Sequence, residues 1–209
     1  MDGERAITRL GIFGGTFDPI HNGHLAAAEE VLARFELDRV LFVPAGSPWQ
    51  KEGFSAAEDR WTMTVLAMED HPRFEASRVE IDRRGPTYSV DTLTVLRDFH
   101  GPDVALYFIA GLDAVLTLGT WHGVEDFGAT AEVIAVTRPG YEPADLQPRA
   151  GWPAVTYADI PPLDVSSTEI RARVGEGLDI DSFVPPGVAR YIYDRGLYRS
   201  EPVAAGRSA

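Results

Sequence analysis

Short apolar runs alternate along the chain with longer segments in which apolar residues recur every three or four positions. Each run has the length and composition of a buried strand, and the longest are continuous apolar stretches typical of central parallel strands. The runs cover residues 10–13, 38–43, 79–81, 104–110, 131–137 and 154–157.

Helical periodicity fills most of the segments between these runs. Residues 25–35 place Leu25, Ala28, Val31, Leu32 and Phe35 on one helical face. Further helices are expected from about Tyr88 to Phe99, over 166–174 and over 187–195. Because strands and helices alternate throughout, the pattern predicts an α/β fold: a doubly wound, Rossmann-like parallel sheet with helices on both faces.

One more helix is expected after a Pro/Gly-rich loop over 44–54. Ser55 and Glu58 have the spacing of a capping box at its start, and it must end before Pro72. Its inward face is expected to carry Trp61, Val65 and Met68.

The length of 209 residues fits a single domain over 1–209. A small C-terminal helical subdomain is expected from about residue 166, and the small and polar residues 200–209 are expected to form a mobile tail. The sequence does not determine the oligomeric state, and a homo-oligomer is one possibility.

Composition narrows the function classes. The chain has no cysteine, which excludes disulfides and thiol catalysis, and its net charge of −13 argues against binding nucleic acid. No apolar run approaches the roughly 18 residues of a membrane span and no signal peptide is evident, so a cytoplasmic protein is expected. A small anionic substrate is still compatible with this charge if a few cations cluster locally.

The turn over residues 14–24, Gly-Gly-Thr-Phe-Asp-Pro-Ile-His-Asn-Gly-His, offers such a cluster. A glycine-rich turn between a strand and a helix lets backbone N–H groups approach an anion, and the helix end adds about half a positive charge. With Asn22 as the helix N-cap, His21 and His24 could both donate to one anion. The alternatives are histidines that only pack, or a zinc pair, for which no third ligand lies nearby.

A second informative stretch begins at Ser166, which with Glu169 forms a capping box. Ser167 and Thr168 then present hydroxyl and N–H groups from the first helical turn. Arg171 lies near the positive end of its own helix, which a bound anion would compensate. A surface arginine paired with a nearby carboxylate is the alternative.

Four features follow predicted strands, where ligands bind in open parallel sheets. They are the 14–24 turn, the loop with Lys51, Gly111-Leu112-Asp113, and Arg138. Asp113 could bind ribose hydroxyls or cap a helix, and Trp121 could anchor the core or stack on a flat ring. The chain shows no Ser-His-Asp pattern and no obvious carboxylate pair. Its candidate residues are mainly donors for phosphate groups, which suits phosphoryl or nucleotidyl transfer, in which the substrate supplies the nucleophile.

These motifs resemble those of a known superfamily. Residues 14–24 resemble the signature of the nucleotidyltransferases with a His/Thr-x-Gly-His motif, and 167–171 are similar to their second motif. Within that superfamily the chain is similar to the bacterial nicotinate-nucleotide adenylyltransferases from about Arg9 to Tyr198. The supporting segments are 43–46 with Lys51, 85–93, 108–113, Trp121 and 138–140.

The resemblance implies transfer of an adenylyl group from ATP to nicotinate mononucleotide, with Mg²⁺, giving deamido-NAD and pyrophosphate in NAD biosynthesis. It implies catalytic roles for His21, His24 and Arg171. The implied ATP-binding residues are Gly14, Gly15, Thr16, Phe17, Gly111, Asp113, Ser167 and Thr168. The implied nicotinate mononucleotide-binding residues are Lys51, Thr87, Tyr88, Trp121 and Arg138.

The chain departs from these relatives at two places. The segment Pro48-Trp49-Gln50-Lys51 lacks the second proline and the histidine that many of them carry, and His122 stands where an aromatic residue is frequent. The alternatives are an adenylyltransferase for nicotinamide mononucleotide or phosphopantetheine, or a non-catalytic nucleotide-binding sensor. The protein ligands of a metal are not identified by the sequence.

Overall fold

The computed structural model describes residues 6–46, 54–137, 146, 149–160 and 165–199. Lys51, Arg138 and the expected tail over 200–209 lie outside this set. The expectations for those residues therefore stay predictions.

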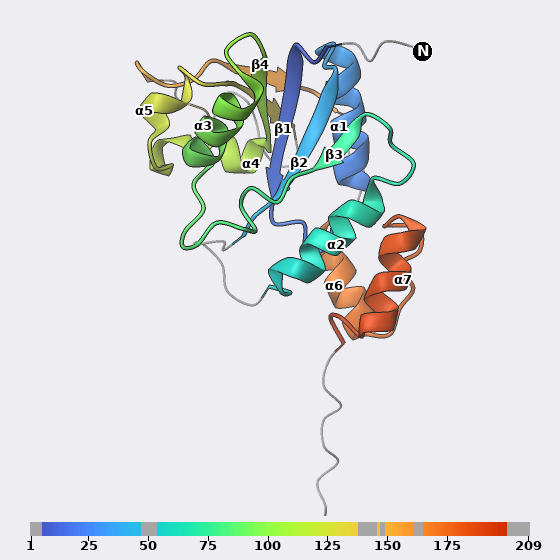
Figure 1. The fold of residues 1–209 in the computed structure, drawn as a ribbon. Helices are drawn as coiled ribbons and strands as arrows, with labels where there is room; N and C mark the ends of the chain where they lie inside the picture. Colours follow the sequence, from blue (N-terminus) through green and yellow to red (C-terminus); the bar gives the residue numbers. More distant parts are fainter. Residues whose placement is uncertain (1–5, 47–53, 138–145, 147–148, 161–164, 200–209) are drawn as a thin grey trace, which may run out of the picture.

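A parallel sheet forms the centre of the described structure (Figure 1). Its six strands lie in the order β3-β2-β1-β4-β5-β6, and every neighbouring pair is parallel. The strands are β1 (Arg9–Gly15), β2 (Arg39–Pro44), β3 (Phe74–Ala76), β4 (Ala105–Gly111), β5 (Glu132–Val136) and β6 (Val155–Ala158). This is the strand order of a doubly wound, Rossmann-like sheet, which confirms the predicted fold class.

Helices pack on both faces of the sheet, as the alternating pattern predicted (Figure 1). They are α1 (Asn22–Arg34), α2 (Ala57–Ala67), α3 (Ser89–His100), α4 (Leu112–Val115), α5 (Val124–Phe127), α6 (Ser167–Gly175) and α7 (Pro186–Arg195), with a 3₁₀ turn, η1, at Leu118–Thr120. The short elements α4, η1 and α5 were not predicted. No helix in the described part of the chain is long and apolar enough to cross a membrane.

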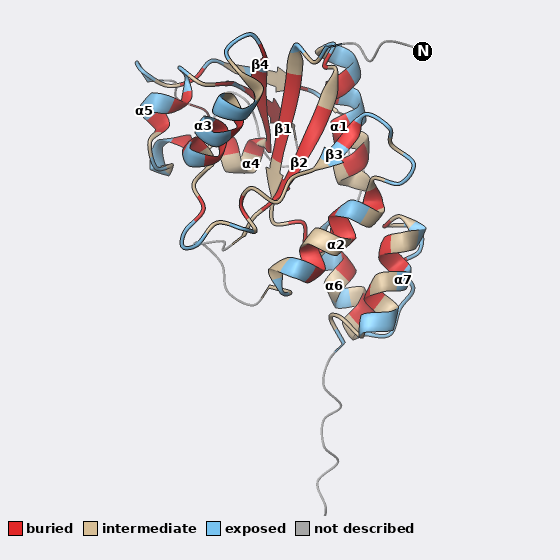
Figure 2. Ribbon diagram, in the orientation of Figure 1, coloured by how far each residue is buried: buried red, intermediate tan, exposed pale blue. Residues whose placement is uncertain are grey.

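Buried residues lie along the strands and on the helices that cover them (Figure 2). The apolar ones form two cores, one on each face of the sheet. One lies between the sheet and α1, α2, α6 and α7, and the other between the sheet and α3, α4 and α5. The strands pack closely: a Cβ on Gly11 would lie 2.8 Å from a Leu37 methyl and 2.9 Å from an Ile109 methyl. The continuous apolar run in β4 is buried from Leu106 to Ala110, as expected for a central parallel strand.

The last helices, α6 and α7, gather with α2 beyond the carboxyl ends of the strands (Figure 1). The Tyr191 hydroxyl on α7 donates to the buried carboxylate of Asp59 on α2 over 2.8 Å. Because α6 and α7 share the apolar core of α1 and α2, they are part of the same packed unit.

The structure corrects the predicted third strand. Residues 79–81 form a turn, in which the N–H of Asp82 donates to the carbonyl of Arg78 over 2.9 Å. The strand is β3, where Phe74 is buried and its ring lies 5.3 Å from that of Phe42. Pairing with β2 therefore follows the large apolar residue rather than the alternating pattern around Glu80.

The predicted orientation of α2 is also wrong. Its buried residues are Asp59, Arg60, Met63, Thr64 and Ala67, whereas Val65 is 42% exposed and Trp61 and Met68 are only half-buried. The predicted capping box is absent because Ala56 is the N-cap. The Ser55 N–H donates to Asp18 over 3.2 Å, and Glu58 pairs with Arg78.

Candidate active site

The site lies where the strand order reverses between the neighbouring strands β1 and β4, the usual place for a ligand in such sheets. A pocket of about 400 Å³ opens at their carboxyl ends. Its lining residues are Gly14, Gly15, Thr16, Ala45, Glu80, Thr87, Tyr88, Ser89, Phe108, Ala110, Asp113, Ala114, Thr117, Trp121 and His122. Seven of the predicted site residues are thus brought into one cavity: Gly14, Gly15, Thr16, Thr87, Tyr88, Asp113 and Trp121.

The glycines of the first turn allow aromatic rings to lie against the backbone. A Cβ on Gly15 would lie 2.7 Å from the Phe17 ring, and one on Gly14 would lie 3.1 Å from the Phe108 ring. Phe17 has a positive φ of 50° and is buried, so its ring points into the core instead of the pocket. Phe17 is not among the pocket's lining residues, so its predicted contact with ATP stays a prediction.

His21 and His24 form a stacked pair at the start of α1. His21, not Asn22, is the N-cap, because its backbone is extended and Asn22 is the first helical residue. The His21 N–H donates to Nδ1 of His24 over 3.3 Å, and the ring centroids lie 3.7 Å apart. Asn22 instead donates from its side chain to the Ser182 carbonyl over 3.1 Å.

The geometry assigns distinct roles to the two nitrogens of His24. Since Nδ1 accepts a hydrogen bond, the proton of the neutral ring is on Nε2, which makes that atom a donor. The Phe17 ring packs perpendicular to the His24 ring at 5.1 Å and limits its rotation. The histidine pair is therefore held in place before any ligand arrives.

Helix α6 brings the second motif to the first. Ser166 caps it by accepting from the Glu169 N–H over 3.1 Å, as predicted. Arg171 donates to the Asp18 carbonyl over 2.7 Å and to the Thr168 hydroxyl over 3.3 Å. The Ser167 hydroxyl donates to the Pro19 carbonyl over 2.9 Å, so it ties α6 to the turn. These residues border the turn but are not among the pocket's lining residues.

Arg60 is a supporting residue that the sequence did not reveal. It is 1% exposed, and its guanidinium donates to the carbonyls of Thr16, Ala45, Gly46 and Ser55. Burial lowers the pKa of Arg60, and the nearby Asp18, Tyr198 and Glu80 partly offset this effect. One planar cation thus fixes the ends of β1 and β2 and the start of α2.

The opposite wall of the pocket is aromatic. The Trp121 ring packs against those of Phe108 and Phe127, with centroids 5.8 and 5.9 Å away, and its Nε1 donates to the Thr117 hydroxyl over 3.2 Å. The rings of Tyr88 and His122 lie 4.4 Å apart. Trp121 is therefore both a packing residue and part of the pocket wall.

Glu80 is a buried carboxylate in this pocket that was not predicted as a site residue. The Thr92 hydroxyl donates to it over 2.8 Å. Burial raises the pKa of Glu80, while hydrogen bonds from Thr92, Thr87 and the Gly46 backbone act in the opposite direction. The carboxylate therefore joins the 79–83 turn, the loop after β2 and the start of α3.

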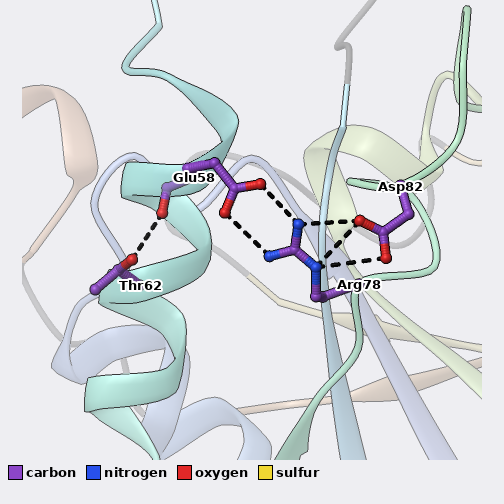
Figure 3. Close-up of polar contacts among 4 residues, drawn as sticks. All are labelled: Glu58, Thr62, Arg78 and Asp82. Carbon is purple, nitrogen blue, oxygen red and sulfur yellow. Dashed lines mark hydrogen bonds and ion pairs between the residues drawn. The ribbon is translucent and has the colours of Figure 1, made fainter.

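An ion-pair network on the surface holds the same turn against α2 (Figure 3). Arg78 donates to both carboxylate oxygens of Glu58, at 3.0 and 2.7 Å, and to Asp82 at 2.9 Å. These bonds lower the pKa of Glu58 and raise that of Arg78. The Arg78 guanidinium also lies 5.1 Å from the centroid of the Trp61 ring and covers it.

The described residues contain no group of three or more His, Cys, Asp or Glu side chains placed to hold a metal ion. Asp18, the acidic residue of the first turn, is 1% exposed and already accepts hydrogen bonds from Tyr198 and Ser55. Asp113 and Glu80 are the carboxylates that line the pocket. This donor set fits a Mg²⁺ ion coordinated mainly by phosphate oxygens and water.

The chain matches the cytidylyltransferase-like family model over residues 12–173. It is 52% identical over 200 residues to a protein of Saccharopolyspora erythraea, covering 95% of this chain and 93% of that one. It is also 52% identical over 192 residues to a protein of Streptomyces coelicolor, covering 90% of this chain and 100% of that one. Both carry the name "probable nicotinate-nucleotide adenylyltransferase".

Solved structures share the fold. A nicotinic acid mononucleotide adenylyltransferase of Plasmodium falciparum, complexed with NaAD, superposes with a TM-score of 0.76 at 20% identity and covers 91% of this chain and 97% of its own. The same protein complexed with APC gives a TM-score of 0.75 over the same shares.

Proposed function

The chain belongs to the cytidylyltransferase-like family and, within it, to the nicotinate-nucleotide adenylyltransferases, and from this premise we propose that it joins ATP and nicotinate mononucleotide into deamido-NAD and pyrophosphate in NAD biosynthesis. What supports this most directly is the contact between Arg171 and the Asp18 carbonyl. This contact holds the cation of the second motif beside the histidine turn of the first, and Gly14, Gly15 and Thr16 of that turn line the pocket.

The chemistry needs no nucleophile from the protein. A phosphate oxygen of nicotinate mononucleotide attacks the α-phosphorus of ATP in line, a new phosphoanhydride bond forms, and the bond to the β-phosphate oxygen breaks to release pyrophosphate. His24 donates from Nε2 to phosphate oxygens, with His21 beside it, and Arg171 binds the triphosphate. Because these groups are fixed in advance, they stabilise the charge that develops during transfer.

The remaining pocket residues bind the two substrates. Gly14, Gly15 and Thr16 line the pocket and lie against the phosphates, and Asp113 binds the adenosine side. Gly111, at the end of β4, and Thr168, on α6, are outside the pocket lining and are assigned to the adenosine side and the triphosphate by resemblance alone. Trp121 stacks on the pyridine ring, while Thr87 and Tyr88 at the start of α3 bind its carboxylate side. Lys51 and Arg138 are assigned to this same substrate by resemblance alone.

Mg²⁺ accompanies ATP in this proposal and neutralises part of the triphosphate charge when bound. Asp113 is the pocket carboxylate with a place in the first turn of a helix, where it can bind water around such an ion. Removal of Mg²⁺ with a chelator is therefore expected to abolish turnover.

The decisive experiment measures pyrophosphate release with ATP and Mg²⁺ and each of three acceptors: nicotinate mononucleotide, nicotinamide mononucleotide and 4′-phosphopantetheine. A large preference for the first supports the proposed substrate. Preference for either of the others keeps the adenylyl transfer and overturns the assignments of Trp121, Thr87 and Tyr88. No release with any acceptor, despite measurable ATP binding, favours a nucleotide-binding sensor.

A further inference from the structure

Asp18 is the acidic residue of the first motif, and the proposed reaction gives it no role. It is 1% exposed, and its carboxylate accepts from the Tyr198 hydroxyl over 2.6 Å and from the Ser55 N–H over 3.2 Å. A hydrogen bond from a hydroxyl to a carboxylate is among the stronger ones in proteins. The side chain of Asp18 is therefore held from two sides, by the segment after α7 and by the segment before α2.

The main chain of Asp18 has a separate partner in Arg171, whose Nη1 donates to its carbonyl over 2.7 Å. One residue thus connects Tyr198, through its side chain, to Arg171, through its backbone. The next carbonyl, of Pro19, accepts from Ser167 on the same helix as Arg171. A shift of Asp18 would move the acceptor that orients the Arg171 guanidinium and also the chain that leads into His21.

The backbone after α7 directs the Tyr198 hydroxyl toward Asp18. Gly196 closes α7 in the left-handed region, and the Leu197 N–H donates back to the Ile192 carbonyl over 3.0 Å. Tyr198 itself has a positive φ of 62°, which turns its ring toward Asp18 and Met63. Burial and the Asp18 charge raise the pKa of Tyr198, so the hydroxyl remains a donor throughout the neutral range.

We propose that Tyr198 and Asp18 are positioning residues for adenylyl transfer: the Tyr198 hydroxyl fixes Asp18, and Asp18 orients Arg171 toward the triphosphate. This rests on the proposed function, since the transferred group defines what Arg171 must face. A purely structural tie between the C-terminal segment and the first turn is the competing explanation. A positioning role predicts a lower kcat in the variants, whereas a purely structural tie predicts a lower melting temperature with kcat retained.

The test compares Tyr198→Phe with Tyr191→Phe. Both variants lose one Tyr–Asp hydrogen bond that involves a C-terminal tyrosine, but Tyr191 contacts Asp59 on α2 and not the first motif. We expect Tyr198→Phe to lower kcat about tenfold or more while KM for nicotinate mononucleotide stays within about twofold. Tyr191→Phe should keep kcat within about twofold even where its melting temperature falls equally.

Asp18→Asn and the double variant with Tyr198→Phe test whether the two residues act together. If Tyr198 acts through Asp18, the double variant loses little more kcat than Asp18→Asn alone. Unchanged kcat in Tyr198→Phe, or an equal loss in Tyr191→Phe, would overturn the proposal. A double variant whose loss of kcat equals the product of the two single-variant losses would also overturn it.

A binding measurement separates this proposal from the proposed function. Calorimetric titration with inorganic pyrophosphate and Mg²⁺ reports on Arg171 without any acceptor. We expect Tyr198→Phe to bind pyrophosphate about fivefold or more weakly than wild type and Tyr191→Phe to match wild type. The two failures are distinguishable. The proposed function fails if wild type releases no pyrophosphate with any acceptor. The positioning role fails if wild type, Tyr198→Phe and Tyr191→Phe bind pyrophosphate equally well.

Discussion

The backbone N–H of His21 hydrogen-bonds to Nδ1 of His24 over 3.3 Å, so the helix start itself selects which nitrogen of His24 faces a ligand. In most capping boxes a carboxylate or amide side chain reaches back to the N-cap. Here an imidazole does so, and its second nitrogen remains a donor. The local capping chemistry and the proposed phosphate contact are thus two functions of one side chain.

We predict that His24→Ala lowers kcat about a hundredfold or more, because it removes a fixed donor at the developing charge. The fold should survive because His21 remains the N-cap, although the melting temperature should fall, since the variant loses the hydrogen bond from the His21 N–H to the imidazole. Steady-state pyrophosphate release together with calorimetric melting tests this. Turnover near that of wild type would contradict the proposed mechanism.

Trp121→Ala is expected to raise KM for nicotinate mononucleotide about fivefold or more, with a smaller change in KM for ATP, since stacking on the pyridine ring is lost. The matched control is Trp152→Ala, because Trp152 packs against Gly119 outside the pocket lining. Both variants should lose stability, but only the first should weaken substrate binding. An equal effect on both KM values would show that Trp121 serves packing alone.

Gly15→Ala should disturb the first turn, because the new Cβ would lie 2.7 Å from the Phe17 ring. That ring is enclosed by Phe13, Phe42 and His24, so overpacking is expected to cost about 1–3 kcal/mol and to reduce kcat. In Gly187→Ala, the control on α7, the nearest atom would lie 3.5 Å away. Denaturant unfolding should show a lower free energy of unfolding for Gly15→Ala and little change for Gly187→Ala.

The buried Glu80 makes stability depend on pH. Burial raises its pKa above the ordinary value of 4.5, so the folded chain binds this proton more tightly than the unfolded chain. Its contribution to the free energy of unfolding is therefore fully present below about pH 4.5 and is lost as the pH rises through the folded-state pKa. The side chain of Glu80→Gln does not titrate. In urea unfolding from about pH 4 to 8, the free energy of unfolding of wild type minus that of Glu80→Gln should therefore fall as the pH rises. A value that rises with pH would refute this.

The central sheet was predictable because burial on both faces requires continuous apolar runs. The run over 104–110 differs from β4 by one residue at each end, and the Ser166 cap is where its side-chain chemistry placed it. The face of α2 was not predictable. Its largest fully buried side chain is Arg60, and burial of an arginine depends on carbonyls supplied by three separate segments, which no local pattern contains.

The same limit applies to the site. Glycines and histidines next to one another indicated the first turn, and the capped helix indicated Arg171. Arg60 and Tyr198 support that turn from positions far along the chain, and Glu80 supports the pocket wall. Each would be taken for an ordinary surface or core residue in its own sequence context. Their roles come from tertiary contacts alone.

The bond between Tyr198 and Asp18 spans 180 positions, and that between Arg171 and Asp18 spans 153. During translation the turn over residues 14–24 is therefore synthesised long before Arg171 and Tyr198, the residues that hydrogen-bond to it. At about 5–20 residues per second, the interval between synthesis of Asp18 and Tyr198 is roughly 9–36 seconds. During that time the nascent polypeptide can begin to build its sheet, but the hydrogen bonds of Arg171 and Tyr198 to Asp18 cannot yet form.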